Sequence, residues 1–276
     1  MKASLLLLVF AGVVGCGAAD GQSFPDAAGS SDARLDSTPS FGDGGAGDDA
    51  AVCDPPDMLI VLDRSDSMGS SAGKDADGGA LPSKWELAKD ALDHITAPPA
   101  DEKLRFGLEV LPKASGLCGT GEPLVAMDLG TGATIATTLS TTKLVYGTPI
   151  GGALAVAVTT LSNAKVPDRD QYVILVTDGA ETCSSNGPLP IVQSLAAAGV
   201  KTYVIGFGAA VDKALLNDLA CAGRTATKLS TACKQSGSGY VSAGGTAPLY
   251  FSATDGTSLQ TALATITGSV CCGCVN

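Results

Sequence analysis

The stretch MLIVLDRSDSMG, residues 58–69, decides the fold that the sequence predicts. Its first five residues are apolar without alternation, a pattern that predicts a strand buried on both faces, as in the middle of a parallel sheet. A loop of short, oxygen-bearing side chains follows at once. We therefore expect a central strand that places an Asp-x-Ser-x-Ser motif at the carboxyl end of a sheet.

The motif spaces one carboxylate and two hydroxyls two residues apart, at Asp63, Ser65 and Ser67. A tight loop turns such side chains toward a common point, and oxygen ligands suit a hard cation such as Mg2+. The hydroxyls add no charge, so a bound ion stays electron-poor and keeps a position for an outside carboxylate. The alternative interpretation is a serine-rich turn that caps the next helix.

A second continuous apolar run, residues 172–176, leads directly into Thr-Asp-Gly, with Asp178 in the middle. The glycine permits a tight turn, so Asp178 is expected at the end of a second core strand. Between the two runs, Pro149 suits the first turn of a helix that continues through Leu161. This helix start places Thr148 at a loop–helix junction with its hydroxyl free.

The other expected elements alternate between strands and helices. Ser83 and Glu86 form a capping box that opens a helix, and His94, the one histidine, lies near its end as a charge close to the helix C-terminus. Two strands are expected to pair at one side of the sheet, at 104–111 and 124–129. Further helices are expected at 134–140, 190–198, 213–221 and 259–266, and further strands at 201–207 and 248–253.

This succession predicts the α/β class. Strand, helix and parallel strand joined by right-handed crossovers build a doubly wound, Rossmann-like sheet. We expect the sheet to be mostly parallel with one antiparallel edge strand, and to carry helices on both faces.

Asp63, Ser65 and Ser67, then Thr148 within Thr-Pro-Ile-Gly, then Asp178 within Thr-Asp-Gly resemble the metal-ion-dependent adhesion site of von Willebrand factor type A domains. The resemblance covers residues 57–269 and fills all five positions in the right order. It implies direct hydroxyl ligands, with the two aspartates acting directly or through water. It also implies that an acidic side chain of a partner protein completes the coordination of Mg2+ or Mn2+, since the ion inverts the local field of an acidic domain.

Two acidic residues lie close to these motifs. Asp66 is expected to be a solvated bystander, and Glu181 to have a structural role or, at most, a place at the rim of the site. The loop 70–82 departs from the family pattern by its length, and it contains Asp75 and Asp77. It lacks the later ligands of a calcium-binding loop, so we expect a surface loop beside the metal site that influences the choice of partner.

Residues 1–15 resemble the signal peptide of a bacterial lipoprotein, because Lys2 precedes an apolar run too short to span a bilayer. The sequence VVGC that ends at Cys16 resembles a lipobox, which implies lipidation of that cysteine and an exported protein at the outer membrane or cell surface. Ordinary signal cleavage beside a chance cysteine is the alternative. Residues 16–52 are rich in Gly, Ala, Ser and Asp and are expected to form a disordered acidic tether. Residues 53–276 then form the folded domain with a cysteine-rich tail.

The chain has nine cysteines, so eight remain besides Cys16. An even number in an exported protein predicts four disulfides. We expect Cys53 to pair with one of the last three cysteines, and Cys183 to pair with Cys221 or Cys233. The sequence CCGC at 271–274 lacks the histidine or second Cys-x-x-Cys that a zinc site needs.

A formal net charge of −11 argues against nucleic acid as a partner, because a phosphate backbone requires a basic patch. The sequence has no Gly-x-Ser-x-Gly elbow and no P-loop, so no enzyme is expected. The predicted function is a surface-anchored protein-binding or adhesion module that depends on a divalent metal. The alternative is a structural scaffold domain of a surface or motility complex, in which the metal only stabilises the loop.

Overall fold

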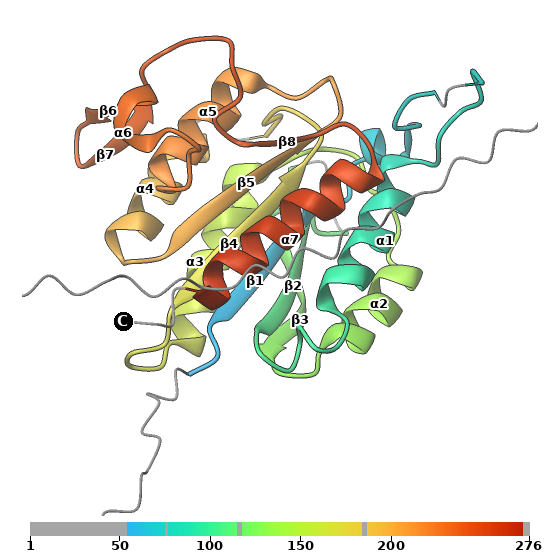
Figure 1. Cartoon of the computed structure of the whole chain (residues 1–276), viewed down its shortest axis with the longest axis horizontal. Helices are drawn as coiled ribbons and strands as arrows, with labels where there is room; N and C mark the ends of the chain where they lie inside the picture. The colour runs from blue at the N-terminus through green and yellow to red at the C-terminus, as the bar shows by residue number, and fades with distance from the viewer. Residues whose placement is uncertain (1–53, 75–76, 115–117, 184–186, 273–276) are drawn as a thin grey trace, which may run out of the picture. The chain divides into compact units, whose positions relative to one another are not determined.

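Strand β1 (Asp57–Asp63) occupies the middle of a six-stranded sheet of order β3-β2-β1-β4-β5-β8 (Figure 1). The computed structural model describes residues 54–74, 77–114, 118–183 and 187–272, without the side chains of 271 and 272. All neighbouring strands pair in parallel except β3, which pairs antiparallel with β2. The other strands are β2 (Arg105–Leu111), β3 (Glu122–Asp128), β4 (Gln171–Thr177), β5 (Lys201–Phe207) and β8 (Phe251–Ala253).

The lack of alternation in β1 follows from cover on both faces of the sheet. Met58, Ile60 and Leu62 belong to one hydrophobic core, and Leu59 and Val61 belong to the other. All seven residues of the strand are buried. A parallel strand packed on both sides gains by being apolar at every position, which is the pattern that the sequence shows.

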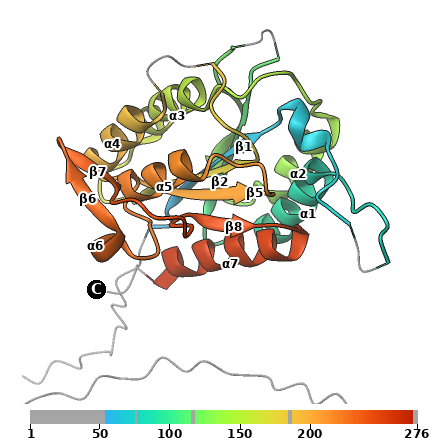
Figure 2. The same cartoon turned by 90° about the horizontal axis from the view of Figure 1, so that it is seen from above.

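Two layers of helices cover the sheet, as Figure 2 shows from above. One core includes side chains of three helices and the other core those of three more, so the predicted doubly wound fold is confirmed. The first set is α1 (Lys84–Thr96), α2 (Gly132–Thr141) and α7 (Gly256–Cys272), and the second is α3 (Ile150–Ala164), α4 (Leu189–Ala197) and α5 (Lys213–Ala222).

Helix α1 begins where its capping sequence predicts. The Ser83 hydroxyl accepts a hydrogen bond from the Glu86 backbone N–H at 3.2 Å. Trp85 and Leu92 lie on the buried face of the helix, while His94 lies exposed in the last turn. A Ser cap fixes the first turn of a helix and is worth about 1 kcal/mol, so the first residue of α1 is well defined.

The last third of the domain differs from the prediction. Strand β8 is shorter than expected and α7 is longer. The sequence also gave no indication of α6 (Leu229–Ala232) or of a two-stranded hairpin formed by β6 (Cys233–Ser236) and β7 (Gly239–Ser242). The β6 strand is polar and mostly exposed, so it lacks the alternating apolar pattern by which a strand is recognised.

The disulfides correct the expected pairing of Cys183. It bonds to Cys118, and Cys221 bonds to Cys233. The loops after β2 and β4 meet because both strands flank β1 and end at the same edge of the sheet. The second disulfide connects α5 to the β6–β7 hairpin. The predictions for Cys16, the tether and Cys53 lie outside the described residues, as do the side chains of the cysteines at 271–274.

None of the helices in the described part of the chain is long and apolar enough to cross a membrane.

Strand β2 contains a fully buried carboxyl group, Glu109. Neither of its side-chain oxygens has a hydrogen-bond partner among the described residues. Gly121 lies against the carboxyl group and leaves no room for a Cβ. Burial raises the pKa of Glu109 from its ordinary value of 4.5 to about 8. The neutral acid is therefore the form that the folded domain holds at neutral pH.

We predict that Glu109→Gln stabilises the domain at pH 8. Between pH 4.5 and about 8 the folded state binds a proton at Glu109 that the unfolded state has released, so the stability of the native protein falls as the pH rises through this window. The neutral amide of Gln does not titrate and so avoids this loss. The free energy of unfolding at pH 8 should therefore rise by about 2 to 5 kcal/mol. Urea unfolding at several pH values measures it. Glu102→Gln, at an exposed site, is the control, and an unchanged pH dependence in Glu109→Gln contradicts the prediction.

We predict that the two disulfides contribute unequally to stability. Cys118–Cys183 spans 65 residues and Cys221–Cys233 spans 12. In the chain-entropy model the longer loop gives about 4 kcal/mol and the shorter about 3 kcal/mol. The paired variants Cys118→Ala/Cys183→Ala and Cys221→Ala/Cys233→Ala, unfolded in urea, measure the two losses without leaving a lone thiol. A larger loss from the second pair contradicts the entropic account.

Candidate metal centre

The five predicted ligands lie on segments that meet at one edge of the sheet, where strand order reverses. Strands β1 and β4 are neighbours, and the chain leaves β1 toward β2 on one side and β4 toward β5 on the other. Asp63 ends β1, and Asp178 directly follows β4. In open α/β sheets, ligands bind outside the carboxyl ends of the strands at such a point. The fold therefore delivers both carboxylates to its preferred binding position.

The carboxylate of Asp63 is fully buried and hydrogen-bonded on both oxygens. Oδ1 accepts the Ser65 backbone N–H at 2.7 Å, and Oδ2 accepts the Thr177 hydroxyl at 2.6 Å. Burial raises the pKa of Asp63 to about 6. The hydrogen bonds from Thr177 and Ser65 act in the opposite direction and lower this pKa, and the negative charge of Asp178 raises it slightly. A cation beside such a carboxylate favours its charged form.

A chain of hydrogen bonds connects the two motifs across the sheet. The hydroxyl oxygens of Ser65 and Ser67 are 2.9 Å apart, and the Ser67 hydroxyl donates to Asp178 Oδ1 at 2.7 Å. The other oxygen of Asp178 accepts a hydrogen bond from Lys84 Nζ. The predicted ligands of the first and third motifs are therefore in direct contact.

Thr148 lies beside the loop that follows Asp178. A Cβ added at Gly179 would be 3.7 Å from the Thr148 hydroxyl oxygen, and Thr148 is 5% exposed. The structure thus brings four of the predicted ligands into one hydrogen-bonded group and places the fifth next to that group.

The donor set matches the preference of a hard cation. It consists of two carboxylates and three hydroxyls, without a thiolate or an imidazole. Oxygen ligands of this kind suit Mg2+ and Mn2+. Within the described residues no group of three or more His, Cys, Asp or Glu side chains gathers to hold a metal.

Arg64, which sequence reasoning overlooked, holds the first motif in place. Its Nε donates to the Pro112 carbonyl at 2.8 Å, and its Nη2 binds the Glu122 carboxylate at 2.6 Å. Its backbone carbonyl accepts the N–H of Val145 at 2.9 Å, on the segment that leads to Thr148. The only signal in the sequence was an arginine at the variable position of Asp-x-Ser, which by itself indicates nothing.

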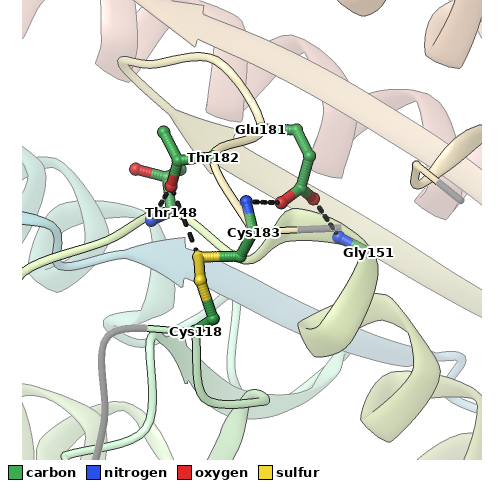
Figure 3. Close-up of a disulfide and its surroundings, with 6 residues drawn as sticks. All are labelled: Cys118, Thr148, Gly151, Glu181, Thr182 and Cys183. Carbon is green, nitrogen blue, oxygen red and sulfur yellow. Dashed lines mark hydrogen bonds between the residues drawn. A yellow bond between two sulfur atoms is a disulfide. The ribbon is translucent and has the colours of Figure 1, made fainter. Parts of the chain in front are cut away.

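Two hydrogen bonds also fix the backbone of Thr148, as Figure 3 shows in part. Its N–H donates to the Thr182 hydroxyl at 2.8 Å, and the Thr182 N–H donates to the Thr148 carbonyl at 3.2 Å. The next residue, Cys183, is bonded to Cys118. A disulfide therefore fastens the loop that holds one predicted ligand.

Glu181 has a structural role. Its carboxylate accepts the N–H of Gly151, in the first turn of α3, and the N–H of Cys183, both at 2.7 Å (Figure 3). A carboxylate at a helix N-terminus satisfies an otherwise unpaired donor and interacts well with the helix dipole. The second acidic neighbour, Asp66, is exposed in a short 3-10 helix, η1 (Asp66–Gly69), as a solvated bystander would be.

The long loop after the first motif is partly ordered by its own backbone. Isolated bridges join Ser71 to Ser83 and Lys74 to Ala80, so the loop doubles back on itself before α1 begins. Asp75 lies outside the described residues. The influence of this loop on partner choice stays a prediction.

Residues 124–235 match the model of the von Willebrand factor type A domain. The match contains Thr148 and Asp178 and begins after the Asp-x-Ser-x-Ser motif. No match to a curated protein was found.

Solved structures share the fold at low sequence identity. An aerotolerance-related membrane protein from Bacteroides fragilis has 16% identity and a TM-score of 0.54, over 78% of this chain and 99% of that one. The vWF domain of the pili tip protein Mfa5 from Porphyromonas gingivalis has 13% identity and a TM-score of 0.54, over 82% and 98%. Proximal thread matrix protein 1 from the mussel byssus, with a zinc-occupied MIDAS motif, has 19% identity and a TM-score of 0.54, over 79% of this chain and 48% of its own.

The family model and the structural neighbours agree with the architecture built from the strands upward. Residues 124–235 are therefore similar to von Willebrand factor type A domains, and the chain shares with these solved structures its parallel sheet with one antiparallel edge strand and helices on both faces.

Proposed function

We propose that this chain is a surface-anchored protein-binding or adhesion module that depends on a divalent metal. One observation carries the proposal: two buried carboxylates and three hydroxyls, from three distant segments, lie at the binding edge of the sheet. Asp63, Ser65, Ser67, Thr148 and Asp178 would hold Mg2+ or Mn2+. When bound, the metal supplies an electrophilic position that an acidic side chain of a partner protein fills.

The residues of the site divide into two roles. The hydroxyls of Ser65, Ser67 and Thr148 would bind the metal without reducing its charge. Asp63 and Asp178 would offset part of that charge, directly or through water. Because hydroxyl ligands are neutral, the loaded site would retain attraction for an outside carboxylate.

The names of the structural neighbours support an interaction role. They include a pili tip protein, a thread matrix protein and a pilus adhesin, SpaC from Lactobacillus rhamnosus GG, which has 14% identity and a TM-score of 0.53 over 79% of this chain and 30% of its own. We further propose that lipidation of Cys16 anchors the protein to a membrane and that residues 16–52 act as its tether. No catalytic residue forms part of the proposal.

A scaffold in a surface or motility complex is the competing function. The buried ion pair between Lys84 and Asp178 favours it, because it gives Asp178 a partner without any metal. Partner binding that persists in a chelator would support the scaffold, and binding that needs Mg2+ would support the adhesion module.

We predict saturable binding of Mg2+ and Mn2+ to the purified protein in acetate buffer, where acetate supplies the outside carboxylate. Asp63→Ala should weaken binding by about 100-fold or more, because the mutation removes a buried charge of the site. Isothermal calorimetry measures the affinity, and circular dichroism checks the fold. Asp66→Ala, in the same loop but exposed, is the matched control and should bind as the wild type does. Absence of binding in the wild type contradicts the proposed function.

A further inference from the structure

Lys84 places a buried cation inside the candidate metal centre. Its Nζ donates a hydrogen bond to Asp178 Oδ2, and the pair forms a salt bridge. The Lys84 side chain is 10% exposed and that of Asp178 is 0% exposed. A lysine near a surface normally extends its ammonium into water. Here the ammonium points inward at a predicted metal ligand, so its charge belongs to the site.

The fold builds a place for this side chain. Lys84 is the first residue of α1, positioned by the Ser83 cap. Its stem lies against Gly208, the residue after β5, where an added Cβ would be 3.3 Å from Lys84 Cδ. Gly208 has a φ of +96°, a conformation that favours glycine. Its N–H donates to the Ala253 carbonyl at 2.7 Å, which fixes this turn to β8. The position of the ammonium is therefore set by α1, β4 and the end of β5.

A buried ammonium needs compensation, and Asp178 supplies it directly. Two other charged groups near the motifs are already paired, and Asp66 is exposed to solvent. Arg64 binds Glu122, and Glu181 accepts two backbone N–H groups. The charges that face the proposed ion are consequently those of Asp63, Asp178 and Lys84.

The formal charge of the site follows from these three groups. Two carboxylates and one ammonium give −1, whereas the carboxylates alone would give −2. With a divalent cation bound, the site with the ammonium has a formal charge of +1, and the site without it would have a charge of 0. Like charges a few ångströms apart in a protein repel, and unlike charges attract. The ammonium therefore opposes the metal, and in the loaded site it favours an anion.

We infer that Lys84 is a specificity-determining residue, which lowers the affinity of the site for the divalent metal and gives the loaded site the positive charge that selects a carboxylate ligand. The inference rests on the proposed function, because it concerns the same metal and the same acidic ligand. It makes the metal and the ligand depend on each other: the metal binds weakly alone and more tightly when a carboxylate arrives.

This role has effects of opposite sign. Removing the charge should strengthen metal binding and weaken the contribution of the carboxylate. A lysine that only supports the fold would, when removed, weaken both. The sign of the change in metal affinity therefore separates the two roles.

The test compares Lys84→Gln, Lys84→Arg and Lys89→Gln with the wild type, using Mg2+ titrations in chloride buffer with and without acetate. Lys84→Gln should bind Mg2+ roughly tenfold more tightly in chloride, and the gain in affinity from acetate should fall by a similar factor. Lys84→Arg keeps the charge and should resemble the wild type. Lys89 lies on the same helix and pairs with Glu86 at 2.9 Å, so Lys89→Gln should have no effect.

Thermal unfolding gives an independent readout, because a ligand stabilises the state that it binds. Without metal, Lys84→Gln should melt at a lower temperature, since Asp178 loses its partner. Saturating Mg2+ should then raise its melting temperature by more than it raises that of the wild type.

Each outcome is decisive. Tighter Mg2+ binding by Lys84→Gln than by the wild type, with a smaller gain from acetate, supports the inference. Unchanged or weaker Mg2+ binding in Lys84→Gln, with binding in the wild type, overturns the inference and leaves the proposed function intact. Absence of binding in both proteins, with and without acetate, overturns both.

Discussion

The cover of β1 on both faces is the constraint on which the rest of the structure depends. A strand that is buried on both sides and paired on both edges offers polar partners to a charged side chain mainly at its ends. Asp63 occupies that end, and the same holds for β4 and Asp178. The two strands are neighbours at the reversal of strand order. The hydrophobic cores therefore favour charged carboxylates at the strand ends, where polar partners are available.

The two carboxylates at the polar edge accept hydrogen bonds from several different segments of the chain. Thr177 and the Ser65 backbone bind Asp63, while Ser67 and Lys84 bind Asp178. A buried carboxylate without such partners would take up a proton, as burial does to Glu109 on β2. The surroundings of the carboxyl groups differ. Glu109 lies within β2 and its oxygens have no hydrogen-bond partner among the described residues, whereas Asp63, at the end of β1, accepts hydrogen bonds from a hydroxyl and a backbone amide. Polar partners favour the charged form of a carboxyl group, and their absence favours the neutral form.

The continuous apolar runs and the capping box were sufficient to predict the central strands, most helices and the antiparallel edge, because periodicity reports burial directly. Motif spacing indicated Asp63, Ser65 and Ser67 as candidate ligands, and the resemblance to a known family added Thr148 and Asp178. The sequence did not indicate the roles of Arg64, Thr182 and Lys84, because these roles depend on which loops meet in space. The expected pairing of Cys183 with Cys221 or Cys233 was wrong for the same reason, because Cys183 bonds to Cys118. The β6–β7 hairpin was not predicted, because a polar and exposed strand lacks the alternation of apolar and polar residues that indicates a strand.

The disulfide between Cys118 and Cys183 has a topological consequence. It joins two cysteines that are 65 residues apart and so closes a covalent ring. This ring contains β3, α2, α3 and β4. Thr148 and Asp178 lie within the ring, whereas Asp63 lies before it. A single break of the peptide backbone between the two cysteines therefore cannot divide the molecule. Both sides of the break remain on one covalent body, and a nicked domain would still hold all of its candidate ligands together.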